Sequence, residues 1–178
     1  MRKNLVVISF DYALARRTAE ILSDKFDRRF FDMFDMFTFD NSPNTLTDVL
    51  RMNGEDYVNK EMSGILKNEL DFSGVVFLLD PQIAWLNDEL LNEIRENNVV
   101  IFLKRDFKDE YAHREKIAYK SEEEREYFTY KLDKLHEIHE FIEHELADIS
   151  IDVDSLSYRE IKDNILKKID SLLNETLD

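Results

Sequence analysis

The chain has 178 residues, contains no cysteine and carries a formal net charge of −15 at pH 7. This length suits one domain over residues 1–178, and the charge excludes nucleic acid and anionic membrane as general partners, because both are bound through basic faces. The lack of cysteine excludes disulfides and thiolate metal sites, and it suits the reducing cytoplasm, where we expect the protein.

Short apolar runs alternate with helical patterns along the chain. In chain order we expect a strand at Leu5–Phe10, a helix at Ala13–Phe26, a strand at Arg29–Asp32, a helical stretch at Thr45–Leu70 that breaks near Gly54, a strand at Val75–Leu79, a helix at Trp85–Glu96, strands at Val99–Leu103 and Ile149–Val153, and a last helix capped by Ser157 and Glu160. Leu5–Phe10 is too short for a signal peptide or a membrane span.

This alternation is typical of a parallel sheet, and the continuous apolar run Val75–Leu79 indicates strands that are covered on both faces. We therefore expect an α/β fold: a doubly wound, five-stranded parallel sheet with helices on both faces. A long charged helical region, at roughly residues 106–145, is expected as an insertion or lid before the last strand.

The first strand-to-helix junction, Ser9–Arg17, contains neither glycine nor lysine. In P-loop proteins this junction wraps phosphates with backbone N–H groups, using glycines for close approach and a lysine for charge. Here Asp11 adds a negative charge, and Ala15 stands where the lysine falls. The junction has the surroundings of a phosphate loop without the residues that hold phosphate.

Arg16 and Arg17 are the best candidates for binding a nucleotide or another anion, because the N-terminus of a helix favours negative charge. In the simpler interpretation, which we favour, both are solvated and pair with Glu20 or Asp24 on the same helix.

Three histidines, His136, His139 and His144, raise the question of a metal site. Their spacings of three and five residues differ from the zinc-protease pattern, which needs histidines at i and i+4. A hydrated helix is therefore the expectation, and no metal site is predicted. A metal-dependent hydrolase would depend on this segment alone.

The stretch Phe30–Phe39 holds five phenylalanines and two methionines. One strand cannot bury all of them, so some belong either to a helix over the sheet edge or to an exposed apolar patch. Both alternatives stay open, and the second would mark a surface for a protein partner or for self-association.

Several segments carry a resemblance to the shikimate kinase family of P-loop kinases. They are Asn4–Phe10, Arg29–Asp32, Gly54–Val58, Asn87–Leu103, and Ala147–Asp152 with Ile161. The resemblance covers nearly the whole chain in order, but it consists mostly of scaffold residues. It implies a P-loop kinase fold, with ATP and magnesium as ligands if the family's activity is kept.

The functional residues that the resemblance implies are mostly replaced. The family's Gly-Lys-Ser/Thr falls near Leu14–Arg16, its substrate-binding arginine falls on Asn59, and its triple-glycine turn falls on Leu78–Pro81. Of the family's acidic pair, Asp32 keeps the first member and Phe34 replaces the second. A further family arginine falls near His139.

Two hypotheses follow for the function. The first is a catalytically degenerate, non-enzymatic protein that acts through protein contacts or self-association, without a cofactor. The second is a divergent small-molecule kinase or nucleotide-binding protein with Asp32 or Asp80 as the catalytic or magnesium-binding carboxylate. In that case Arg16, Arg17 and basic residues near the insertion would hold phosphate; these basic residues are Lys104, Arg105, Arg114 and Arg125.

Overall fold

A computed structural model of the protein describes residues 4–44, 46–81, 88–104, 134–154 and 156–175. Its centre is a sheet of five strands: β1 (Asn4–Ile8), β2 (Arg29–Asp32), β3 (Val75–Leu79), β4 (Asn98–Lys104) and β5 (Ile149–Asp152). The strand order is β2-β3-β1-β4-β5, and every neighbouring pair is parallel. The expected five-stranded parallel sheet is confirmed, with strand bounds that differ by a residue or two at most.

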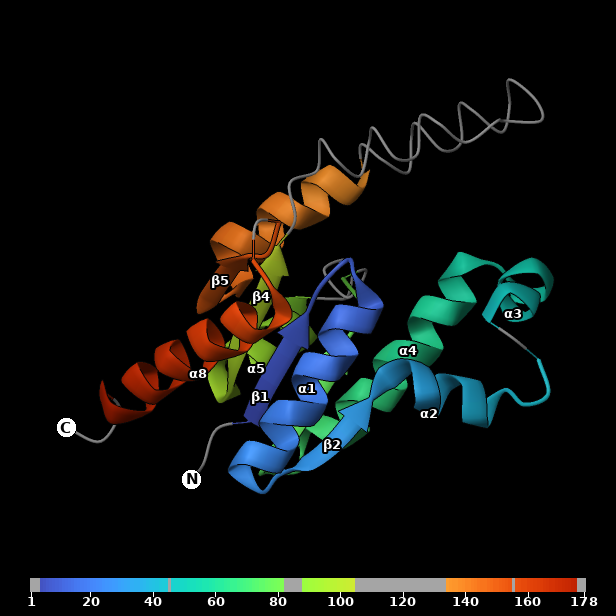
Figure 1. Cartoon of the computed structure of the whole chain (residues 1–178). Coiled ribbons are helices and arrows are strands. Elements are labelled where there is room, and N and C mark those ends of the chain that lie inside the picture. Colours follow the sequence, from blue (N-terminus) through green and yellow to red (C-terminus); the bar gives the residue numbers. More distant parts are fainter. Residues whose placement is uncertain (1–3, 45, 82–87, 105–133, 155, 176–178) are drawn as a thin grey trace.

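The helices cover both faces of this sheet (Figure 1). They are α1 (Tyr12–Phe26), α2 (Met33–Asp40), α3 (Leu46–Asn53), α4 (Glu55–Leu70), α5 (Asp88–Asn97), a helical segment at residues 134–141 that continues as the π-helix η2 (Ile142–Leu146), and α8 (Tyr158–Glu175). Strand side chains such as Leu5 and Val7 pack with α1 and α8. Alternate side chains such as Val6 and Ile8 pack with α2, α4, α5 and η2. This alternation is the period-2 pattern of a strand that is buried on both sides.

The helical stretch after β2 breaks where the sequence predicts. Gly54 separates α3 from α4 and has a φ of 84°, a left-handed conformation that glycine adopts without steric cost. At the start of α8, Ser157 and Glu160 form the expected capping box: the Glu160 carboxylate accepts the Ser157 N–H at 2.8 Å.

Part of the expected insertion belongs to the core. Ile138, Ile142 and Leu146 are buried against the sheet together with Phe102. Residues 105–133, which hold the remainder of the insertion, lie outside the described residues. Among the helices that the structure describes, none has the length and apolar character needed to cross a membrane.

The strand order places a topological switch point at the carboxyl end of β1. The chain leaves β1 toward β2 on one side of the sheet, and β4 lies on the other side, so the order of connections reverses at β1. In open α/β sheets, ligands bind beyond the carboxyl ends of the strands at such a switch point. The junction between β1 and α1 is therefore the first place to look for a site.

Candidate functional site

The junction that connects β1 to α1 is three residues long: Ser9, Phe10 and Asp11. A phosphate loop places four residues between its two glycines alone, so that successive N–H groups surround the phosphates. Here the Ser9 hydroxyl donates to the Leu103 carbonyl oxygen at 2.8 Å and accepts the Asp11 N–H at 3.2 Å. The junction is short and its polar groups bond to the protein itself.

Asp11 closes the N-terminus of α1. Its backbone is extended (φ −97°, ψ 91°), and its carboxylate accepts the Leu14 N–H at 3.0 Å. A negative group at this position also interacts favourably with the positive end of the helix dipole. The protein's own carboxylate therefore takes the kind of interaction that a bound phosphate makes at the N-terminus of a helix.

Phe10 packs across the carboxyl end of β4. Its ring lies 6.3 Å from that of Phe102 in an edge-on arrangement and 6.1 Å from that of His139, nearly parallel to it. The rings of Phe102 and His139 are 5.0 Å apart, edge to face. This cluster of three rings joins the junction to the helical segment at residues 134–141.

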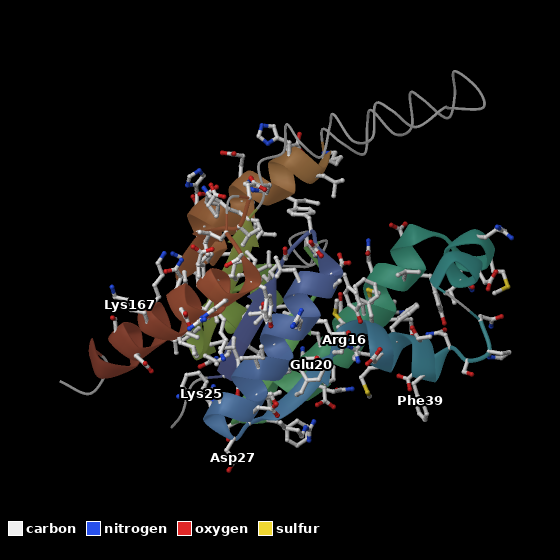
Figure 2. The ribbon with its side chains drawn as sticks, in the orientation of Figure 1. Arg16, Glu20, Lys25, Asp27, Phe39 and Lys167 are labelled. Atoms are coloured by element: carbon white, nitrogen blue, oxygen red, sulfur yellow. The ribbon has the colours of Figure 1, made fainter. Side chains whose placement is uncertain are left out.

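Arg16 lies one turn into α1 and reaches β2 and α2. Its Nη1 lies 2.8 Å from Oδ2 of Asp32, and its Nη2 lies 2.9 Å from Oδ2 of Asp35. The Tyr12 hydroxyl donates to Oδ2 of Asp32 at 2.6 Å. Glu20, which is labelled with Arg16 on α1 in Figure 2, pairs with the guanidinium at 3.3 Å, as the spacing of four residues predicts.

Asp32 is buried within this group, with a side chain that is 1% exposed. Its other oxygen caps α2 by accepting the N–H of Phe34 at 2.9 Å. Burial and, second, the hydrogen bond to Asp32 together raise the pKa of Tyr12 to about 12. The hydrogen bond to Asp35, followed by the one to Tyr12, raises the pKa of Arg16. Asp32 thus works as a helix cap and ion-pair partner.

Arg17 turns toward the opposite side of α1. Its guanidinium carbon lies 3.9 Å from the ring centroid of Tyr158 at the start of α8, and the Tyr158 hydroxyl donates to the Arg17 carbonyl oxygen at 3.1 Å. The two arginines that the sequence suggests as an anion site therefore point to different helices.

Lys104, at the end of β4, forms an ion pair with Glu143 of η2. This hydrogen bond raises the pKa of Lys104 and lowers the pKa of Glu143. The other basic candidates, Arg105, Arg114 and Arg125, lie outside the described residues.

Asp80 directly follows β3, the neighbour of β2. Asp32 is in register with Leu78, so both aspartates stand at the same edge of the sheet. Carboxylates at the ends of neighbouring parallel strands are a common arrangement at magnesium-dependent phosphoryl-transfer sites. Of the candidate carboxylates, Asp32 and Asp80 are thus brought to one edge of the sheet by the strand order.

The three histidines do not gather. His139 is buried, whereas His136 and His144 are exposed and lie 4.0 and 3.3 Å from different oxygens of Glu140. Within the part of the chain that the structure describes, no group of three or more histidine, aspartate or glutamate side chains is arranged to hold a metal ion.

A family model described as shikimate kinase matches residues 16–170. The chain belongs to the shikimate kinase family. No curated protein matches the sequence. The fold of the chain is similar to that of shikimate kinase from Acinetobacter baumannii in complex with shikimate. The two are 15% identical, with a TM-score of 0.75 and coverage of 96% of this chain and 94% of that chain. Shikimate kinase from Aquifex aeolicus is 18% identical, with a TM-score of 0.70 and coverage of 96% and 98%. A sugar kinase from Janibacter sp. HTCC2649 is 14% identical, with a TM-score of 0.61 and coverage of 96% and 95%.

The shikimate kinase match begins at Arg16, within α1, and covers the rest of the chain as far as residue 170. The resemblance to this family, inferred above from scaffold segments, is thereby confirmed.

Sequence reasoning missed the side chains that occupy this edge of the sheet. It treated Asp11 as a charge beside the phosphates, although an aspartate three residues before a helical N–H is a recognisable cap. It expected no hydrogen bond from Tyr12 and assigned no role to Asp35, because pairing between α1 and α2 is a tertiary contact without a local signal. Glu143 as the partner of Lys104 is equally invisible in the sequence.

Proposed function

We propose that this member of the shikimate kinase family is non-catalytic and acts through contacts with other proteins. One observation carries the proposal: the Asp11 carboxylate accepts the Leu14 N–H at the N-terminus of α1. This is the position at which a P-loop protein binds phosphate with backbone N–H groups. A phosphate placed there would meet a fixed negative charge and an N–H group that is already bonded.

The three-residue junction supports the same conclusion. It has no glycine to permit close approach and no lysine to neutralise phosphate charge. A positioned group of this kind lowers the barrier to reaction by about 2.7–4 kcal/mol, so its loss alone slows transfer by orders of magnitude. The residues of the junction therefore do not fit a bound triphosphate.

The described cations at this edge of the sheet add to the case. Arg16 pairs with Asp32 and Asp35, Lys104 pairs with Glu143, and Arg17 stacks on Tyr158. Using any of them for ATP would first require breaking an internal contact. With a net charge of −15, the whole chain also repels a polyanionic substrate.

A thermal unfolding experiment tests this proposal. Because a ligand that binds the folded state raises the melting temperature, millimolar Mg-ATP or Mg-ADP should leave that temperature unchanged. The Acinetobacter baumannii shikimate kinase serves as the positive control. A rise of several degrees with either nucleotide would contradict the proposal.

A divergent small-molecule kinase is the second candidate, and the placement of Asp32 and Asp80 at one edge of the sheet favours it. In this alternative the two carboxylates would serve as base or magnesium ligand, and phosphate would be held by groups other than the junction. The test is ATP turnover with a panel of hydroxyl acceptors, including shikimate and sugars. Turnover that Asp32→Asn abolishes and the exposed control Asp35→Asn retains would support this candidate over the first.

A further inference from the structure

Phe39, near the C-terminal end of α2, is 78% exposed, more than any other large hydrophobic residue that the structure describes. Figure 2 shows its ring pointing away from the body of the protein. The helix buries its opposite side through Met33 and Phe37. Met36, one turn before Phe39, is half-buried, and Asp40 follows it. Phe39 and Asp40 are exposed and end α2, and Met36 packs in part against the core one turn before them; these three residues are here termed the Phe39 face.

The electrostatics of this end of α2 are unfavourable as they stand. A helix C-terminus carries partial negative charge and favours a basic residue. The last turn of α2 has no basic residue, and its final residue is the exposed Asp40. A positive group next to Phe39 would interact favourably with both the carboxylate and the end of the helix.

Two other aromatic rings, those of Phe72 and Tyr158, each have an arginine of their own. The guanidinium of Arg29 lies 5.0 Å from the ring centroid of Phe72, which is 49% exposed, and Arg17 covers Tyr158 at 3.9 Å. Among the described residues, no arginine or lysine lies over Phe39. Phe39, the most exposed ring that the structure describes, thus has no such cation within the described residues, and it lies at a helix end whose last turn has no basic residue.

We propose that the Phe39 face is a docking surface for a basic segment of a partner protein, with an arginine or lysine packed on the ring of Phe39 and paired with Asp40. Aromatic rings bind such cations through their negative faces, and aromatic anchors commonly dominate the energy of an interface. This proposal rests on the proposed non-catalytic function, because it names the kind of partner through which that function operates.

Charge complementarity selects this occupant over a second copy of the chain. Two copies would each bring a net charge of −15 to the contact. A two-fold symmetric dimer through the Phe39 face would also place equivalent carboxylates and helix ends near one another.

The test is binding of a fluorescent peptide of alternating arginine and leucine, measured by anisotropy, with a glutamate–leucine peptide as the charge control. The wild type should bind the basic peptide and not the acidic one. Phe39→Ser should weaken binding at least about fivefold, as expected for an interface anchor. Asp40→Asn should weaken it less and reduce its dependence on salt.

Phe72→Ser is the matched control, because it also removes an exposed phenylalanine but at a ring that already has its own arginine. It should bind the basic peptide as the wild type does. Equal affinity of Phe39→Ser and Phe72→Ser would overturn the proposal. So would a wild-type dimer, seen by sedimentation, that Phe39→Ser converts to monomer, because the occupant would then be a second copy.

Mg-ATP turnover, measured on the same variants, separates this proposal from the one on which it rests. Turnover would refute the non-catalytic function whatever the peptide result. A failed peptide experiment without turnover would refute the docking surface alone.

Discussion

Arg16 and Asp32 form an ion pair with an N–O distance of 2.8 Å between α1 and the end of β2. The Asp32 side chain is 1% exposed, and that of Arg16 is 34% exposed. The pair therefore joins a carboxylate that is shielded from solvent to a guanidinium that is partly exposed at the protein surface. It holds α2 against α1 at the edge of the sheet where the strands have their carboxyl ends.

Replacing Arg16 should destabilise the fold because it leaves the Asp32 carboxylate buried without its cation. Arg16→Met is expected to lower the free energy of unfolding by about 2–3 kcal/mol, since Tyr12 and the α2 amide still bond to Asp32. Arg17→Met, which loses a cation–π contact, should cost about 0.5–1 kcal/mol. Urea unfolding of both variants provides the comparison, and equal losses would contradict this role of Asp32.

Tyr12 should make the protein sensitive to alkaline pH. Its pKa is raised from 10.0 to about 12 in the folded state, mainly by burial. The folded state therefore favours the protonated phenol, and the resulting stability is present below pH 10.0 and lost as the pH rises through about 12. Tyr12→Phe should lack this part of the alkaline loss, whereas Tyr57→Phe, at a tyrosine of similar exposure outside the Arg16–Asp32 cluster, should retain it. Unfolding free energies on both sides of pH 10.0 test the difference.

His139 should make the protein sensitive to acid. Burial lowers its pKa below 6.5; Glu143 and Glu140 oppose this shift, and Lys104 and His136 reinforce it. The neutral imidazole is favoured in the fold, so its contribution to stability is present above pH 6.5 and is lost as the pH falls through the lowered pKa.

His139→Phe keeps an aromatic ring between Phe10 and Phe102 but cannot titrate. Its unfolding free energy should fall less on acidification than that of the wild type. The exposed His136→Gln should behave as the wild type does. Identical pH profiles for all three proteins would show that His139 does not titrate in a buried site.

Asp11 should stabilise α1 because its side chain accepts a hydrogen bond, and its negative charge should not be required. Asp11→Ala is expected to reduce the free energy of unfolding by about 1 kcal/mol, because the Leu14 N–H loses its acceptor. Asn caps helices about as well as Asp, so Asp11→Asn should stay close to the wild type. Thermal or urea unfolding distinguishes the two, and a neutral Asp11→Ala would contradict the assigned hydrogen bond.

The fold was predictable because its signals are local and strong. Val75–Leu79 reads as a strand that is buried on both faces, and Gly54 marks the break between α3 and α4. The bounds shifted slightly, as for α5, which ends at Asn97 instead of Glu96; its expected start at Trp85 lies outside the described residues. The stretch Phe30–Phe39 combines the two alternatives, core packing and surface exposure. Phe31 and Phe37 are buried in the core, and Phe39 is exposed.

The site was less predictable because its contacts join distant parts of the chain. Tyr12 meets Asp32 across 20 residues, and Lys104 meets Glu143 across 39. Composition identifies such residues as charged or polar, but only the packing of α1 and η2 on the sheet decides which of them meet. The sequence indicates what the junction lacks, and the structure adds what replaces it.

A crystal structure grown with Mg-ADP and inorganic phosphate would test the central claim most directly. We expect the Asp11 carboxylate to stay bonded to the Leu14 N–H, with no phosphate density at the N-terminus of α1. Density for a phosphate on that N–H group, with Asp11 rotated away, would contradict the claim that the protein's own side chain closes the site.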